Sequence, residues 1–135
     1  MGKYIEVSKS QVRNLNDLTR YEFDSRYVAN SKGEVFLIKS ETPTKYICLQ
    51  MSPFKTRDGY VEYVLTTPSG SKKHMLGHRI TAGLYLKDVI GKDHVNHIDG
   101  DRANNDISNL EYVTRSENLK HSYEKLGRTP WNKKM

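Results

Sequence analysis

The most constraining feature of this sequence is residues 93–121, where histidines, asparagines and aspartates surround two short apolar runs. Residues 95–98 (VNHI) predict a short strand, which the turn-forming residues 99–101 (DGD) end. A polar loop follows, and residues 110–113 (LEYV) are β-branched and aromatic enough to predict a second strand. We therefore expect two strands joined by a long loop.

A helix is expected directly after the second strand. Thr114 can cap its first turn through a side-chain oxygen, and Glu117, three residues later, completes a capping box. Asn118 and His121 are three residues apart, so they share one face of this helix. If the strands pair and pack against the helix, this face can converge with residues 96–97 on one point.

These features together resemble the His-Asn-His (HNH) endonucleases, in particular the small phage and intron-encoded homing endonucleases. Residue type and spacing agree throughout the stretch. The matching positions are residues 95–100 (VNHIDG), 104–105 (NN), 109–114 (NLEYVT) and 116–118 (SEN), with His121 close behind. The resemblance implies that residues 93–126 form a ββα-metal nuclease motif within an α+β protein.

The resemblance also implies roles for individual residues. In that family a strand histidine is the general base, a loop asparagine holds the loop and orients the base, and a helix residue completes the metal site. Carried over by position, these residues are His97, Asn109 and Asn118. The residue before the base is a metal ligand, here Asn96. His121 lies one turn beyond Asn118 and is the alternative helix ligand, as in other branches of the family.

The chemistry of phosphodiester hydrolysis suits these residue types. It requires a deprotonated water and neutralisation of charge on the departing oxygen, which one imidazole and one divalent ion can provide. His97, with an ordinary pKa of about 6.5, can accept the proton near neutral pH. Amide oxygens are hard donors, so we expect one Mg²⁺ or Mn²⁺ ion. Many family members carry aspartate at the position of Asn96. Because an amide brings no charge, we expect the free protein to bind the ion weakly.

Several neighbouring residues are interpreted as turn residues. Asn104 and Asn105 are expected to be turn formers, because asparagine tolerates the left-handed conformation and bonds its own backbone. Asp99 is interpreted as a turn carboxylate, with a supporting role beside the metal ligands as the alternative. His94 is expected at the surface.

The charge of the chain indicates a polyanionic partner. The 135 residues carry a net charge of +6 and a pI of about 9.4, which favours nucleic acid or an anionic membrane. No segment approaches the roughly 18 apolar residues of a membrane span, so a membrane is disfavoured as the partner.

The single cysteine, Cys48, excludes an internal disulfide and a multi-cysteine zinc site. This fits a reducing cytoplasm, that of a bacterial host cell if the chain is phage-encoded. No small-molecule cofactor is expected.

A small antiparallel sheet is predicted before the motif. In residues 1–25 the apolar residues do not recur with a decisive period, and this stretch is interpreted as a separate N-terminal segment. Residues 26–92 predict strands at 26–29, 34–38, 46–51, 59–65 and 72–76, and a helix at about 77–86. This order is similar to the N-terminal modules that precede the nuclease motif in phage homing endonucleases. The module can contact DNA or only bury the back of the motif, and the sequence leaves both open.

Basic residues concentrate after the second predicted strand of the motif. Residues 115–135 hold six basic and two acidic residues, a net charge of +4. Residues 127–135 are too short and polar to fold alone, so we expect a basic arm along DNA or, alternatively, a solvated tail. The candidate DNA-contacting residues are Arg79, Arg102, Arg115, Lys120, Lys125, Arg128, Trp131, Lys133 and Lys134.

The resulting hypothesis is a metal-dependent DNA endonuclease of the HNH homing type. The first alternative is a DNA-binding module with weak or lost cleavage, motivated by the uncharged metal ligands. The second is an RNA-directed nuclease, since a basic arm alone does not distinguish DNA from RNA. We see no long apolar heptad or other dimerisation signal, so we expect a monomer that nicks double-stranded DNA.

Overall fold

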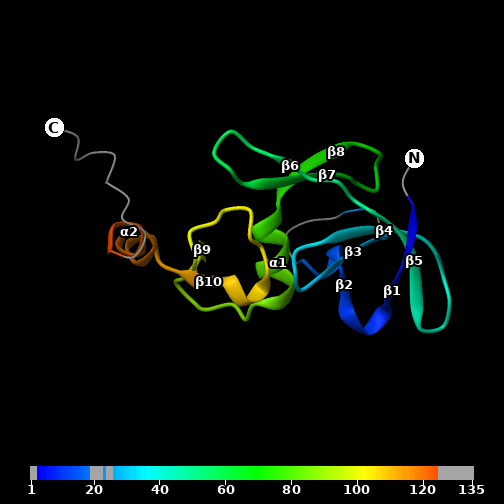
Figure 1. The fold of residues 1–135 in the computed structure, drawn as a ribbon, viewed down its shortest axis with the longest axis horizontal. Helices are drawn as coiled ribbons and strands as arrows, with labels where there is room; N and C mark the ends of the chain where they lie inside the picture. Colours follow the sequence, from blue (N-terminus) through cyan, green and yellow to red (C-terminus); the bar gives the residue numbers. More distant parts are fainter. Residues whose placement is uncertain (1–2, 19–22, 24–25, 125–135) are drawn as a thin grey trace.

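The computed structural model of the protein describes residues 3–18, 23 and 26–124. In these residues an α+β fold combines three antiparallel sheets with two α-helices (Figure 1). The elements in order are β1 (Tyr4–Ser8), η1 (Lys9–Gln11), β2 (Val12–Asn14), η2 (Leu15–Asp17), β3 (Tyr27–Asn30), β4 (Val35–Glu41), β5 (Lys45–Gln50), β6 (Phe54–Lys55), β7 (Val61–Thr66), β8 (Lys72–Leu76), α1 (Gly77–Tyr85), β9 (His94–His97), η3 (Ile107–Asn109), β10 (Leu110–Val113) and α2 (Arg115–Glu124). Neither α-helix of the described residues is long and apolar enough to span a membrane.

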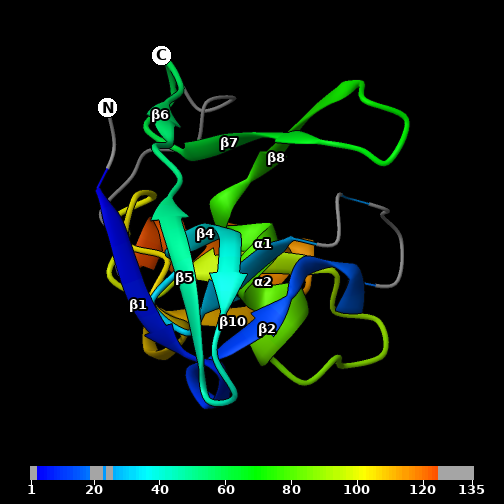
Figure 2. The ribbon, with the colours of Figure 1, turned by 90° about the vertical axis from the view of Figure 1, so that its right-hand side faces the viewer.

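The first half of the chain forms a five-stranded antiparallel sheet in the order β1-β5-β4-β3-β2 (Figure 2). Ile5 in β1 lies opposite Cys48 in β5, and Val12 in β2 lies opposite Asn30 in β3. The predicted separation of residues 1–25 is therefore wrong, because this segment supplies both edge strands of the sheet. The two strands are only five and three residues long. They carry too few alternating positions to be recognised from the sequence.

A second sheet, in the order β6-β7-β8, stands beside the first. We predicted one sheet from residues 26–92, and the structure divides these strands between two. A shared apolar core joins both sheets to α1: Ala29 of β3, Leu65 of β7 and Ile80 of α1 are each at most 1% exposed and belong to one cluster. The predicted helix at 77–86 is confirmed to within one residue.

The predicted nuclease motif folds as a strand, a loop, a strand and a helix. β9 and β10 pair as an antiparallel hairpin, with His97 opposite Leu110 and Asn96 opposite Glu111. α2 follows directly. The α1 helix contacts both strands of this hairpin and β3 of the five-stranded sheet, so it lies between them (Figure 1).

The predicted capping box at the start of α2 is confirmed. The backbone N–H of Glu117 donates to Thr114 Oγ1 at 3.1 Å, and the backbone N–H of Thr114 donates to Glu117 Oε1 at 2.9 Å. These bonds and the side chain of Lys92 hold the pKa of Glu117 below its ordinary value. The box satisfies two backbone donors that would otherwise lack partners at this end of the helix.

Candidate active site

His97 is the last residue of β9, and its side chain is buried, with only 6% of the residue exposed. Its Nε2 lies 2.8 Å from Oδ1 of Asn105. Because an amide oxygen only accepts, Nε2 carries the hydrogen and Nδ1 keeps its lone pair. Nδ1 makes no hydrogen bond with any described residue. His97 is thus held in the tautomer that can accept a proton at Nδ1.

Asn105 is buried between two glycines that come from outside the motif. A Cβ on Gly33, in the turn between β3 and β4, would lie 2.9 Å from Asn105 Cβ. A Cβ on Gly77, the first residue of α1, would lie 2.7 Å from Asn105 Nδ2. The prediction that Asn105 is only a turn former is therefore wrong, because the residue is 6% exposed and bonds the candidate base.

Asn109 holds the loop between the two strands, as its family role implies. Its Oδ1 accepts from the backbone N–H of Asp99 at 3.0 Å, and its Nδ2 donates to Asp99 Oδ1 at 2.9 Å and to the carbonyl of Asn104 at 3.0 Å. Among the described residues no hydrogen bond joins Asn109 to the side chain of His97, whose Nε2–H donates to Asn105 instead.

Asp99 is a turn carboxylate, as predicted. It accepts from the side chains of Asn104 and Asn109 and from the backbone N–H of Asp101. The hydrogen bond from Asn104, then that from Asp101 and that from Asn109, hold the pKa of Asp99 below its ordinary value. Its carboxylate is therefore engaged in closing the loop.

A second histidine lies against His97, and no role was assigned to it from the sequence. His78, the second residue of α1, is 7% exposed, and its ring centroid lies 5.1 Å from that of His97 and 5.3 Å from that of Tyr60. Burial, and then the positive charges that His97 and Arg79 can carry, lower the pKa of His78 to about 4. His78 is therefore neutral near pH 7. Its Nδ1 is buried without a hydrogen-bond partner among the described residues.

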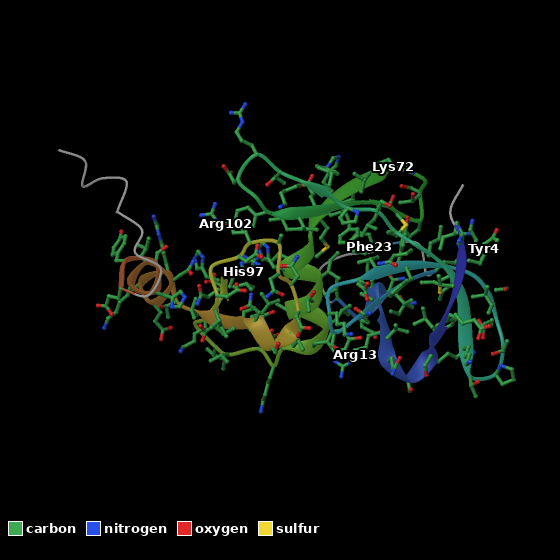
Figure 3. All side chains as sticks on the ribbon, viewed as in Figure 1. Tyr4, Arg13, Phe23, Lys72, His97 and Arg102 are labelled. Carbon is green, nitrogen blue, oxygen red and sulfur yellow. The ribbon has the colours of Figure 1, made fainter. Side chains whose placement is uncertain are left out.

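Arg102 connects the loop of the motif to the turn before β7. Its guanidinium lies 5.0 Å from the centroid of the Tyr60 ring, and its Nη1 donates to the carbonyl of Asp58 at 2.9 Å. In Figure 3, Arg102 and His97 lie on the side of α1 nearer to α2, and Tyr4 lies at the opposite end of the molecule. The turn that carries Tyr60 therefore lies beside His97.

Asn96 directly precedes His97 in β9 and is 4% exposed. Its Nδ2 donates to Oε2 of Glu111 at 2.8 Å. Its Oδ1 makes no hydrogen bond with the described residues. An amide oxygen without a protein partner is a suitable hard donor for a divalent ion.

The two candidate helix ligands, Asn118 and His121, have different environments. Asn118 is half-buried, and its side-chain amide makes no hydrogen bond with the described residues. Nε2 of His121 lies 3.0 Å from the carbonyl oxygen of Ile98 and must therefore donate to it. His121 thus fastens α2 to the end of β9. Residues 3–18, 23 and 26–124 contain no group of three His, Cys, Asp or Glu side chains that could hold a metal.

The candidate DNA-contacting residues fall into two sets. Arg79 donates through Nη1 to the carbonyl of Asp93 at 2.9 Å, and Arg115 and Lys120 are exposed on α2. The remaining candidates, Lys125, Arg128, Trp131, Lys133 and Lys134, lie outside the described residues, as does the predicted basic arm at 127–135.

Comparison with known proteins decides the family. The HNH endonuclease family matches residues 91–120, which run from the approach to β9 into α2. The chain belongs to the HNH endonuclease family.

An uncharacterized HNH endonuclease of Acanthamoeba polyphaga mimivirus is 32% identical over 100 residues, which are 74% of this chain and 28% of that protein. The SPbeta prophage-derived protein YosQ of Bacillus subtilis (strain 168), named as an HNH homing endonuclease, is 39% identical over 69 residues, which are 51% of this chain and 40% of YosQ. This HNH protein thus spans less than half the length of these two relatives.

A solved structure has the same fold. The HNH homing endonuclease I-HmuI, in a structure described as DNA binding and cleavage by that enzyme, aligns with a TM-score of 0.69 and 22% sequence identity. The alignment covers 90% of this chain and 63% of the I-HmuI chain. The likeness extends well beyond the 30 residues of the family match, so the arrangement of sheets around the motif is shared as well.

Proposed function

We propose that this HNH protein is a metal-dependent DNA endonuclease that hydrolyses phosphodiester bonds with His97 as the general base. The observation that carries the proposal is the fixed imidazole of His97. Asn105 accepts the hydrogen of Nε2 at 2.8 Å, which leaves Nδ1 to take a proton from water. The neighbouring His78, neutral near pH 7, adds no positive charge that would oppose protonation of His97.

One Mg²⁺ or Mn²⁺ ion would be held by Asn96 and Asn118. Both have amide oxygens without a hydrogen-bond partner among the described residues, and Asn96 is buried. We favour Asn118, whose side-chain amide makes no hydrogen bond with the described residues; His121, whose Nε2 donates to the carbonyl of Ile98 and leaves the lone pair of Nδ1 for an ion, is the alternative. The ion would neutralise charge on the departing 3′ oxygen. The expected products carry a 5′ phosphate and a 3′ hydroxyl.

DNA is the proposed substrate. The net charge of +6 favours a polyanion, YosQ is named as a homing endonuclease, and I-HmuI is described as binding and cleaving DNA. We propose that the protein acts as a monomer in the cytoplasm and nicks one strand of double-stranded DNA, since the chain carries one motif.

The test is incubation of supercoiled plasmid with the wild-type protein and the His97→Ala variant in Mg²⁺, Mn²⁺ or EDTA. We expect nicked product that requires the metal, and a rate about 10²–10⁴-fold lower for His97→Ala. His94→Ala is the matched control, because His94 lies in the same strand and its side chain makes no hydrogen bond with the described residues, only an ion-pair contact of 3.8 Å with the exposed Asp93. Cleavage by His97→Ala at the control rate would remove the role of His97.

A second function is favoured by one observation, the amide at position 96, which brings no charge to a metal. Under that alternative the protein binds DNA with weak or no cleavage. Tight binding of a plasmid without metal-dependent scission would support it. Faster scission of an RNA substrate in the same assay would instead support an RNA-directed nuclease.

A further inference from the structure

The side chain of Glu111 lies next to the proposed metal ligand Asn96. The two residues face each other across the β9–β10 hairpin, and Nδ2 of Asn96 donates to Glu111 Oε2 at 2.8 Å. Asn96 is 4% exposed, whereas Glu111 is exposed. This bond fixes the orientation of the Asn96 amide, because its oxygen and nitrogen are both attached to Cγ and point in different directions. With Nδ2 directed at Glu111, Oδ1 is directed away from it.

Among the described residues, no lysine, arginine or histidine forms an ion pair with the carboxylate of Glu111. Glu117, the next acidic residue along the chain, differs in this respect: it pairs with Lys92 at 3.1 Å and also accepts the cap bond from Thr114. An exposed carboxylate beside a buried amide is thus the nearest negative charge to the uncharged ligand at position 96.

We propose that Glu111 is a positioning residue for the divalent ion, acting through Asn96. It orients the amide so that Oδ1 is presented to the ion, and it supplies the negative charge that an aspartate ligand would have carried. A carboxylate that accepts a hydrogen bond from a ligand also increases the electron density on the ligand's donor atom. Such partners commonly change metal affinity by about 10–100-fold. The inference rests on the proposed function only in assuming that Asn96 binds the ion.

The test is titration of the full chain with Mn²⁺, following the loss of the free-ion signal by electron paramagnetic resonance. We expect Glu111→Gln to bind Mn²⁺ about 10–100-fold more weakly than wild type. Glu6→Gln is the matched control for loss of one negative charge, since Glu6 lies on β1 and pairs with Lys45. The control should bind as wild type does. Thermal unfolding should give the same Tm for both variants, because both positions are exposed.

A double variant, Asn96→Asp with Glu111→Gln, moves the charge onto the ligand itself. We expect it to bind Mn²⁺ at least as tightly as wild type. A double variant as weak as Glu111→Gln would overturn the charge argument, and unchanged affinity in Glu111→Gln would overturn the role of Glu111. Failure of the wild type to bind Mn²⁺ would overturn the inference too. His97-dependent plasmid nicking is scored separately, so the proposed function is judged on its own result.

Discussion

Replacing Asn105 by leucine tests whether the hydrogen bond to His97 controls cleavage. Leucine has the same number of side-chain heavy atoms and the same branch at Cγ as asparagine, and it lacks the acceptor. It would leave the Nε2–H of His97 unpaired at a site where the histidine is 6% exposed. An unpaired buried donor costs about 1–3 kcal/mol. The ring can relieve that cost by moving its hydrogen to Nδ1, which is the atom proposed to accept a proton from water.

The expected loss of activity follows from this magnitude. If the cost of 1–3 kcal/mol falls on the reactive tautomer, the cleavage rate decreases by about 5- to 150-fold, since 1.36 kcal/mol is a factor of ten. Plasmid nicking at fixed Mg²⁺ measures the rate. Nitrogen-15 NMR of the imidazole measures the tautomer independently of activity.

Two further variants separate this role from a purely structural one. Asn104→Leu is the matched control, because the side chain of Asn104 bonds the Asp99 carboxylate in an exposed part of the loop. Its cleavage rate should stay within about threefold of the wild-type rate. A change of that size is well below the tenfold decrease that corresponds to about 1.4 kcal/mol of activation free energy. Asn105→Asp keeps an oxygen acceptor and should retain the Nε2–H tautomer. The reasoning is refuted if Asn105→Leu cleaves at the wild-type rate with hydrogen still on Nε2.

Two other predictions concern stability. Below pH 6.5 the unfolded chain protonates His78 but the folded chain does not until about pH 4, so stability should fall by up to about 3 kcal/mol as the pH drops through this window. Urea unfolding at pH 7 and pH 4.5 should show a smaller difference for His78→Phe, and an equal difference would contradict the prediction. Thr114→Ala should lower the unfolding free energy by about 0.5–2 kcal/mol through loss of the cap to Glu117. Ser116→Ala, on an exposed position of the same turn, is its control and should change it little.

Local patterns could be predicted from the sequence. The strand at residues 94–97, the strand at 110–113 and the cap at Thr114 each depend on a few consecutive residues. The residue types that favour each strand, and the two residues that form the cap, therefore lie close together in the sequence. The helix that begins at Gly77 was predictable for the same reason, because its buried positions recur at helical spacing.

The role of Asn105 could not be predicted in this way. Asn104 and Asn105 are adjacent, and asparagine forms turns readily. Only long-range packing distinguishes them: the close approach of Gly33 and Gly77 surrounds Asn105, whereas Asn104 bonds Asp99 at the surface. The strands of residues 4–8 and 12–14 were missed for a related reason, since their partners lie elsewhere in the chain.

These long-range contacts also bear on what the N-terminal module does. His97 and its partner Asn105 belong to the family motif, but residues packed against them do not: Asn105 packs against Gly33 in the turn between β3 and β4, and the ring of His97 packs against His78 of α1 and faces Tyr60 of the turn before β7. Burial of the base and selection of its tautomer therefore depend on residues from outside the hairpin and α2. Whatever contacts the module makes with DNA, it also forms part of the structure that keeps Nδ1 of His97 available.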